Sequence, residues 1–263
     1  MTVQALKDVS RSTLGVLVSL AVVVAVWAAG LRVLDVSSFI GKGPLDVWAY
    51  LALDEDAAEH RAAALGNLQH TLADAALGFV CGLAVALVVA ALFTLVRGVE
   101  DALMPLAMLL RSVPLVAMAP ILILVFGRGT ATVGAMGGIV VLFPALVTLV
   151  LGLRSASPAM LDVVGVFGGS RLAAFRKVAL PASLPAFFTA LRISIPGALT
   201  GALLAEWLAT GQGIGYQIVS DVSRARYESV WASVVVVTLA SLLLYGIVSA
   251  LERLVLRRMG TAA

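Results

Sequence analysis

Charged residues and cysteine are both scarce in this sequence. Only 13% of the 263 residues are charged, whereas 61% are hydrophobic and the mean hydropathy is +1.07, values far outside the range of soluble globular domains. The single cysteine, Cys81, excludes a disulfide framework and a cysteine metal cluster. His60 and His70 have no second ligand at metal spacing. We therefore expect no metal site.

Motifs that support catalysis inside a membrane are also absent. The chain has no Gly-x-Ser-x-Gly, no His-Glu-x-x-His and no paired aspartates at helical spacing, so an intramembrane enzyme would lack its nucleophile or its carboxylate cluster. It has no Gly-x-x-x-x-Gly-Lys-Ser/Thr loop either, so ATP would be bound by another protein. We expect no catalytic residue, no cofactor bound by this chain and no nucleic-acid partner.

Long apolar runs dominate the chain instead. Runs of 18 or more apolar residues indicate membrane helices, because barrel strands leave a much shorter alternating signal. At roughly 20 residues per span there is room for about six spans and for no soluble catalytic domain. We predict one all-α integral membrane domain over residues 1–263, in contact with the lipid bilayer, with spans at 13–31, 67–96, 102–126, 130–151, 185–210 and 230–251.

Proline and glycine mark irregular places in this plan. The third span carries Pro105, Pro114 and Pro120 and should be kinked or partly unwound, because an interior proline frees a backbone carbonyl. Pro196-Gly197 should interrupt the fifth span. We expect a short interfacial helix at 45–53, a flexible turn at 211–216, a polar connector at 221–228, and close helix approach at three glycines of the fourth span, Gly134, Gly137 and Gly138.

The distribution of Lys and Arg predicts the orientation. Across six spans, ten basic residues fall on one side and six on the other, and the richer side faces the cytoplasm by the positive-inside rule. We therefore expect both termini and the loop between spans four and five in the cytoplasm. The ten are Lys7, Arg11, Arg97, Arg154, Arg171, Arg176, Lys177, Arg253, Arg257 and Arg258, and the six are Arg32, Lys42, Arg61, Arg128, Arg224 and Arg226.

That loop, residues 157–181, is a polar and basic island between two apolar spans. Its apolar residues recur at mostly helical spacing on either side of Gly168 and Gly169, which predicts two short amphipathic helices joined by a tight turn. Pro181 stands where a new helix would begin, since proline lacks only an N–H that the first turn leaves unpaired.

The island resembles the cytoplasmic coupling loop of bacterial ABC importer permeases. Their signature, Glu-Ala-Ala, three residues, Gly, nine residues and Ile-x-Leu-Pro, appears here as Asp162-Val163-Val164, Gly168 and Val178-Ala179-Leu180-Pro181. The chain is similar to the nitrate, sulfonate, taurine and bicarbonate branch over roughly 65–258. Further stretches carry that similarity: Leu110 to Ala117, Ala119-Pro120, Phe126-Gly127, Ala205-Glu206-Trp207 and Gly211 to Tyr216.

The resemblance implies a type I ABC importer permease in the bacterial inner membrane. Two permease copies, assembled as a homodimer, would form the pathway for a small anionic solute delivered by an extracytoplasmic binding protein. Two nucleotide-binding ATPase subunits carrying ATP and magnesium would dock on the coupling loop. The expected docking residues are Asp162, Val163, Val164, Gly168, Gly169, Arg171, Phe175, Leu180 and Pro181, with Gly168 forming the turn, Phe175 the apolar anchor and Arg171 a polar contact.

Three further residues are candidates for the translocation pathway: Arg111, Pro114 and Glu206. A charge inside a span is costly and so invites a functional interpretation. Arg111 could face solute, or it could pair with Asp74 or Glu206 inside the protein. Glu206 could gate the outer exit, or anchor the interface together with Trp207.

Several alternatives stay open at the level of the sequence. The island could be an ordinary amphipathic cytoplasmic loop. The chain could be a self-contained secondary transporter, although such proteins normally carry two related halves and we find no convincing internal repeat. The permease could also serve a neutral or cationic nutrient.

Overall fold

The computed structural model describes residues 3–258, and within them every regular element is helical. Residues 1–2 and 259–263 lie outside the described part. So do the side chains of three basic residues used in the orientation count, Lys7, Arg11 and Arg97. In chain order the helices are α1 Val3–Val33, α2 Pro44–Trp48, η1 Ala49–Leu53, α3 Ala57–Leu95, α4 Arg97–Ser112, α5 Leu115–Phe126, α6 Thr130–Arg154, α7 Pro158–Val166, α8 Arg171–Ala174, η2 Phe175–Ala179, α9 Leu180–Ala182, α10 Leu184–Ala205, η3 Glu206–Thr210, α11 Gly213–Ser223 and α12 Tyr227–Arg258. The predicted all-α membrane fold is confirmed, and η1, η2 and η3 are π-helical turns.

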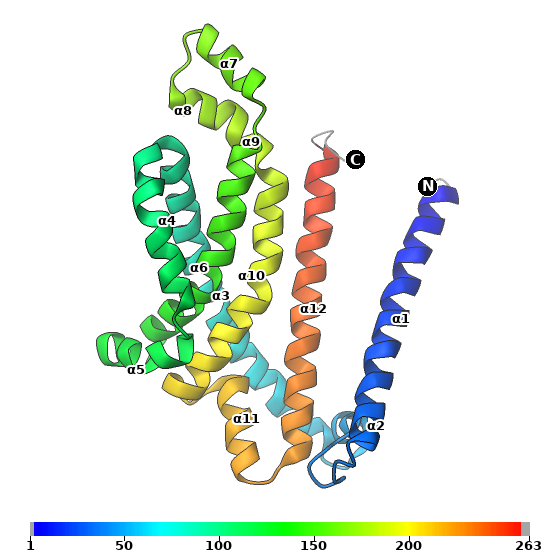
Figure 1. Cartoon of the computed structure of the whole chain (residues 1–263). Helices are drawn as coiled ribbons and strands as arrows, with labels where there is room; N and C mark the ends of the chain where they lie inside the picture. The colour runs from blue at the N-terminus through cyan, green and yellow to red at the C-terminus, as the bar shows by residue number, and fades with distance from the viewer. Residues whose placement is uncertain (1–2, 259–263) are drawn as a thin grey trace.

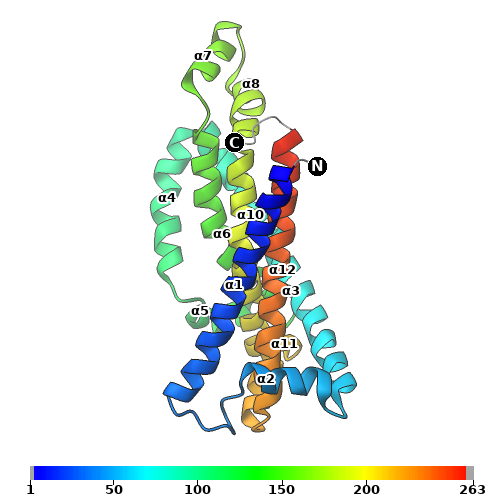
Figure 2. The same cartoon turned by 90° about the vertical axis from the view of Figure 1, so that its right-hand side faces the viewer.

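Four of the described helices are long and apolar enough to cross a membrane: α3, α6, α12, and α10 together with η3. Two shorter apolar helices, Val18–Val33 and α5, accompany them. The described start of α1, the end of α12 and the loop that contains α7 and α8 all lie at one end of the bundle (Figures 1 and 2).

The third predicted span is not one helix. α4 ends at Ser112 and α5 begins at Leu115, with Pro114 in extended conformation at the junction. α5 then turns across the end of the neighbouring helices instead of continuing along α4 (Figure 1). Pro105 and Pro120 lie inside α4 and α5 without breaking them, so the predicted disruption is confirmed at Pro114 alone.

Two other expectations about irregular segments were wrong. α10 runs without a break through Pro196, so Pro196-Gly197 does not interrupt it. Residues 213–223 form α11, so the turn predicted at 211–216 is only its entrance and Asp221 is a buried helical residue rather than part of a polar connector. The short helix expected at 45–53 is present as α2 and η1.

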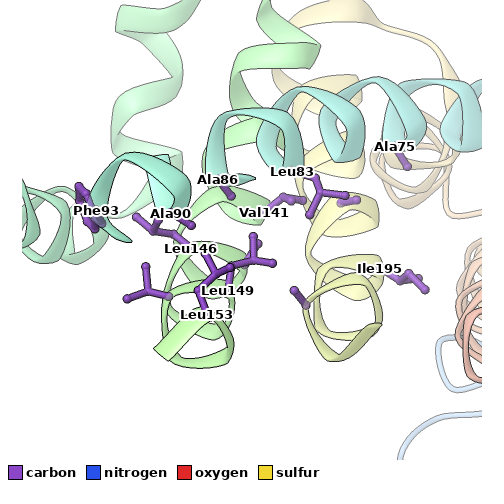
Figure 3. Packing of buried hydrophobic residues seen from close by; sticks show 14 of the residues in the cluster. Ala75, Leu83, Ala86, Ala90, Phe93, Val141, Leu146, Leu149, Leu153 and Ile195 are labelled. Atoms are coloured by element: carbon purple, nitrogen blue, oxygen red, sulfur yellow. The ribbon is translucent and has the colours of Figure 1, made fainter. Parts of the chain in front are cut away.

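The core of the bundle is formed by α3, α6 and α10. Figure 3 shows residues of α3, including Ala86 and Phe93, facing Leu146 and Leu149 of α6, with Ile195 of α10 beside them. All of these side chains are buried. Inside a bilayer the lipid is as apolar as the side chains, so close packing rather than exclusion of water stabilises such a contact.

Glycine allows the three core helices to meet. A Cβ added at Gly137 of α6 would lie 2.8 Å from the Cα of Gly78 in α3, and one added at Gly201 of α10 would lie 2.6 Å from the Cα of Gly137. Gly82 of α3 approaches Gly138 of α6 in the same way, because a Cβ added at Gly82 would lie 2.5 Å from the carbonyl oxygen of Gly138. The predicted close approach is confirmed at Gly137 and Gly138.

At the end opposite the α7–α8 loop, the connections pack on one another. Trp27 of α1 stacks on Trp231 of α12 with ring centroids 5.4 Å apart, and the indole N–H of Trp231 donates to the carbonyl of Ile40 at 2.8 Å. Lys42 pairs with Glu228 at 2.9 Å. From this contact α1 and α12 diverge toward the other end of the bundle (Figure 1).

Candidate functional site

The loop predicted to couple the protein to its ATPase is a helical hairpin that projects from one end of the bundle (Figures 1 and 2). α7 begins with Pro158 at its first turn and ends at Val166, and α8 begins after Ser170, whose hydroxyl accepts a hydrogen bond from the Ala173 N–H at 3.3 Å. The expected pair of short helices joined at Gly168 and Gly169 is therefore present.

The two glycines close the turn for different reasons. Gly168 has φ +74°, the left-handed conformation that favours glycine, and its N–H donates to the Gly165 carbonyl at 2.9 Å. The N–H of Gly169 donates to the Val164 carbonyl at 2.8 Å, which completes a Schellman motif. A Cβ added at Gly169 would lie 2.7 Å from that same carbonyl oxygen. Neither position accepts a larger side chain without moving the turn.

The outer face of the hairpin is apolar although it stands clear of the bundle. Val163, Val166 and Phe167 are 54%, 86% and 86% exposed, and Met160 is also exposed. Asp162 lies beside them and is exposed as well. We call Met160, Val163, Val166 and Phe167 the hairpin face. Apolar groups held outside the spans mark a surface that contacts another protein.

Phe175 lies apart from the hairpin face. It is half-buried and packs against the main core of the bundle together with Val178, while Ala179 next to it is buried. Phe175 therefore joins the hairpin to its own bundle, and the exposed aromatic residue is Phe167, which the sequence analysis did not select. Two features of the sequence could have pointed to Phe167. It directly precedes the turn glycine, and it falls outside the helical stripe of Leu161 and Val164, both of which are half-buried in the structure.

The remaining hairpin residues flank the face. Arg171 is exposed at the start of α8, and no described residue forms an ion pair with it. Leu180 and Pro181 are exposed in α9, which continues the helical backbone of η2 without a break, so the prediction that a new helix begins at Pro181 was wrong. Between them η2 carries Phe175 and the exposed Arg176 and Lys177.

Arg111 and Pro114 lie at the break between α4 and α5. Arg111 is in the last turn of α4 and is exposed, and Pro114 caps α5. The three ion pairs of the described residues join Lys42 with Glu228, Arg154 with Glu100, and Arg192 with Glu252. The alternative in which Arg111 pairs with Asp74 or Glu206 inside the chain was therefore wrong.

Glu206, the first residue of η3, is completely buried beside the first turn of α11. One carboxylate oxygen accepts the N–H of Gly215 at 2.7 Å, and the hydroxyl of Thr71 in α3 accepts the N–H of Ile214 at 2.9 Å. Two side chains from other elements thus satisfy N–H groups that the first turn of α11 leaves unpaired, and the carboxyl group of Glu206 lies at the positive end of the helix.

Glycine makes room for this carboxylate. Gly213 has φ +82°, and a Cβ added there would collide with the Glu206 carboxylate, while one added at Gly215 would collide with the backbone of Leu203. Trp207 next to Glu206 is 46% exposed. The geometry thus gives Glu206 a role in holding α11 against α3 and α10, and does not place it on an exposed face.

Comparison with known proteins agrees with the all-α membrane fold. The model of the family described as "Binding-protein-dependent transport system inner membrane component" matches residues 78–261. A "Probable ABC transporter permease protein" of Haemophilus influenzae is 34% identical over 179 residues, 68% of this chain and 73% of the relative.

Two further relatives have named solutes. A formylaminopyrimidine transport permease protein of Halalkalibacterium halodurans is 28% identical over 190 residues, 72% of this chain and 76% of the relative. A taurine transport system permease protein of Escherichia coli is 28% identical over 196 residues, 74% of this chain and 68% of the relative. The resemblance to ABC importer permeases is confirmed. This multi-pass inner membrane chain belongs to the family of binding-protein-dependent transport system inner membrane components.

Proposed function

We propose that this chain is the permease subunit of an ATP-driven importer and that the hairpin face binds the ATPase. The single observation that carries the proposal is an apolar face, with Phe167 at 86% exposure, held outside the spans on a hairpin rooted in the core. Two ATPase subunits, binding ATP with magnesium, would dock on two permease copies, and the relative named as a probable ABC transporter permease supports that assembly.

The route of coupling follows from the covalent connections. The hairpin is continuous with α6 on one side and α10 on the other, and these two helices form the core with α3. A displacement of the hairpin by the ATPase would therefore shift two core helices together. ATP changes the pathway only if the docked ATPase interacts differently with the two states of the permease.

We further propose that the pathway takes a small anion from an extracytoplasmic binding protein. Arg111 is exposed, unpaired among the described residues and located at a helix break, and a relative is named for taurine transport. The relative named for formylaminopyrimidine transport favours a neutral solute as the second candidate. We retain Arg111 and Pro114 for the pathway, and assign Glu206 to the packing of α11.

A pair of matched variants tests the docking proposal. Full-length chain with a C-terminal tag is purified from its native membranes, and co-purifying proteins are identified by mass spectrometry. Phe167→Asp places a charge on the hairpin face and should lower recovery of an ATP-binding subunit at least tenfold. Leu45→Asp, at an equally exposed leucine in α2 (82% exposed), should leave recovery at the wild-type level.

Recovery of the ATP-binding subunit at the wild-type level in both variants would contradict docking at this face. Loss in both would indicate damage to the whole chain, which the yield and monodispersity of each purified variant would reveal. Secondary transport, the remaining alternative, predicts that no ATP-binding subunit is recovered with the wild type.

A further inference from the structure

A cavity of about 410 Å³ lies where the hairpin joins the bundle. The ends of α3 and α6 form one side, and α7, α8 and η2 form the other. Much of the wall is apolar and buried: Phe93, Leu153, Ala156 and Ala179 are between 2% and 6% exposed. The cavity therefore lies at the root of the hairpin and is separate from the hairpin face.

Two arginines line this otherwise apolar space, Arg154 at the end of α6 and Arg171 at the start of α8. One terminal nitrogen of Arg154 pairs with Glu100, and 56% of its side chain remains exposed. Since a guanidinium has five N–H donors, Arg154 retains donors for a ligand. Arg171 forms no ion pair with any described residue. One carboxylate thus balances two guanidinium groups.

The depth of the cavity in the membrane can be derived from the helices that form it. α6 has 25 residues and ends at Arg154, and α3 ends at Leu95 after a strongly apolar run. At 1.5 Å per residue α6 is about 37 Å long, enough to cross a hydrocarbon core of about 30 Å. The cavity at its end therefore lies at the level of the lipid headgroups.

We propose that this cavity binds the phosphate-bearing headgroup of an anionic phospholipid. Arg171 and the free donors of Arg154 would bind the phosphate, and the apolar wall would contact the glycerol and the first methylene groups. Basic pockets between membrane helices at this depth suit anionic headgroups. Free phosphate shares the charge but would leave the apolar wall uncovered, so the lipid is the better match. The bound headgroup would brace the hairpin against α3 and α6.

Native mass spectrometry of the purified full-length chain tests this directly. The chain in neutral detergent is mixed with either dioleoylphosphatidylglycerol or dioleoylphosphatidylcholine, and lipids retained per chain are counted. We expect preferential retention of phosphatidylglycerol, reduced at least fivefold in its apparent affinity by Arg171→Gln. Arg176→Gln is the matched control, because it removes the same charge from an exposed arginine of η2 outside the cavity and should bind as the wild type does.

Ala174→Leu gives an independent test, because Ala174 lines the cavity and a leucine would fill it without changing the charge. We expect the same loss of phosphatidylglycerol. Inorganic phosphate at equal ionic strength should not raise the melting temperature of the chain.

Equal weakening by Arg171→Gln and Arg176→Gln would overturn the proposal, since surface charge alone would then explain retention. Unchanged binding in Ala174→Leu would overturn it as well. Protection by inorganic phosphate that requires Arg171, without preference for phosphatidylglycerol, would identify a free anion site instead. These measurements use the chain produced and purified without an ATPase subunit, so their outcome does not depend on the docking proposal.

Discussion

At the scale of single residues, glycine and one buried carboxylate determine the shape of the functional region. Gly168 allows the hairpin to reverse, and Gly213 allows Glu206 to reach the first turn of α11. Both glycines have positive φ, a backbone conformation that is strained for residues with a Cβ atom, so each position requires glycine.

Gly168→Val should uncouple transport from ATP hydrolysis. A β-branched residue in the left-handed region costs of order 1–3 kcal/mol, which is enough to open the turn without unfolding the bundle. Gly165→Val is the control, because Gly165 is helical and has open space around its Cβ position. Hydrolysis and uptake are compared in proteoliposomes, and wild-type coupling in Gly168→Val would count heavily against the role of this turn.

Glu206→Ala should destabilise the chain, because the Gly215 N–H would remain buried without an acceptor at a cost of roughly 1–3 kcal/mol. Glu206→Gln keeps a carbonyl acceptor and should melt within a few degrees of the wild type. Thermal unfolding in detergent measures both. A Glu206→Ala chain as stable as the wild type would show that the carboxylate does not hold α11.

At the scale of helices, the crossing of α3, α6 and α10 decides how movement of the hairpin reaches the rest of the protein. Gly137 of α6 is in backbone contact with Gly78 on one side and Gly201 on the other. The same helix offers an internal comparison at Gly134, where an added Cβ would meet its nearest atoms only at 3.6 Å, an ordinary contact.

Gly137→Ala should lower stability where Gly134→Ala does not. Extra volume in a close-packed core costs typically 1–3 kcal/mol, and here backbone atoms of α3 at Gly78 would have to retreat. The two variants differ by one turn of one helix and are compared by the temperature at which each aggregates in detergent. Equal aggregation temperatures of the two variants would mean that the close approach of the helices at Gly137 does not contribute to stability.

The sequence predicted features that local chemistry determines. Gly168-Gly169 predicted the hairpin, Pro114 predicted the break between α4 and α5, and Gly137 predicted close approach, since each depends on neighbours in the chain. Phe175 and Phe167 could not be distinguished, because helical spacing does not reveal whether a stripe faces the bundle or a partner.

Contacts between residues far apart in the chain could not be predicted from local sequence patterns either. The environment of Glu206 depends on Thr71, which is 135 residues away, through their shared contact with the start of α11. α11 itself begins at two glycines, Gly213 and Gly215, that resemble a flexible turn until Glu206 and Thr71 accept its N–H groups. Tertiary contacts thus turned a predicted loop into a helix.

At the scale of the whole molecule, the hairpin and the connection between α11 and α12 lie at opposite ends of the bundle (Figure 1). We predict that the hairpin end, with both termini, faces the cytoplasm. In a Cys81→Ser background, Ser170→Cys should react with a membrane-impermeant maleimide only in inside-out vesicles. Arg224→Cys, exposed at the other end, should react only in right-side-out vesicles, and the reverse pattern would invert the orientation.

The most direct test of the central claim is ATP hydrolysis by the material that purifies with the tagged wild-type chain in mild detergent. We predict a stoichiometric ATP-binding subunit and hydrolysis that vanadate inhibits, both reduced by Phe167→Asp. A chain that emerges alone and without hydrolysis in several mild detergents would contradict the importer and favour a self-contained transporter.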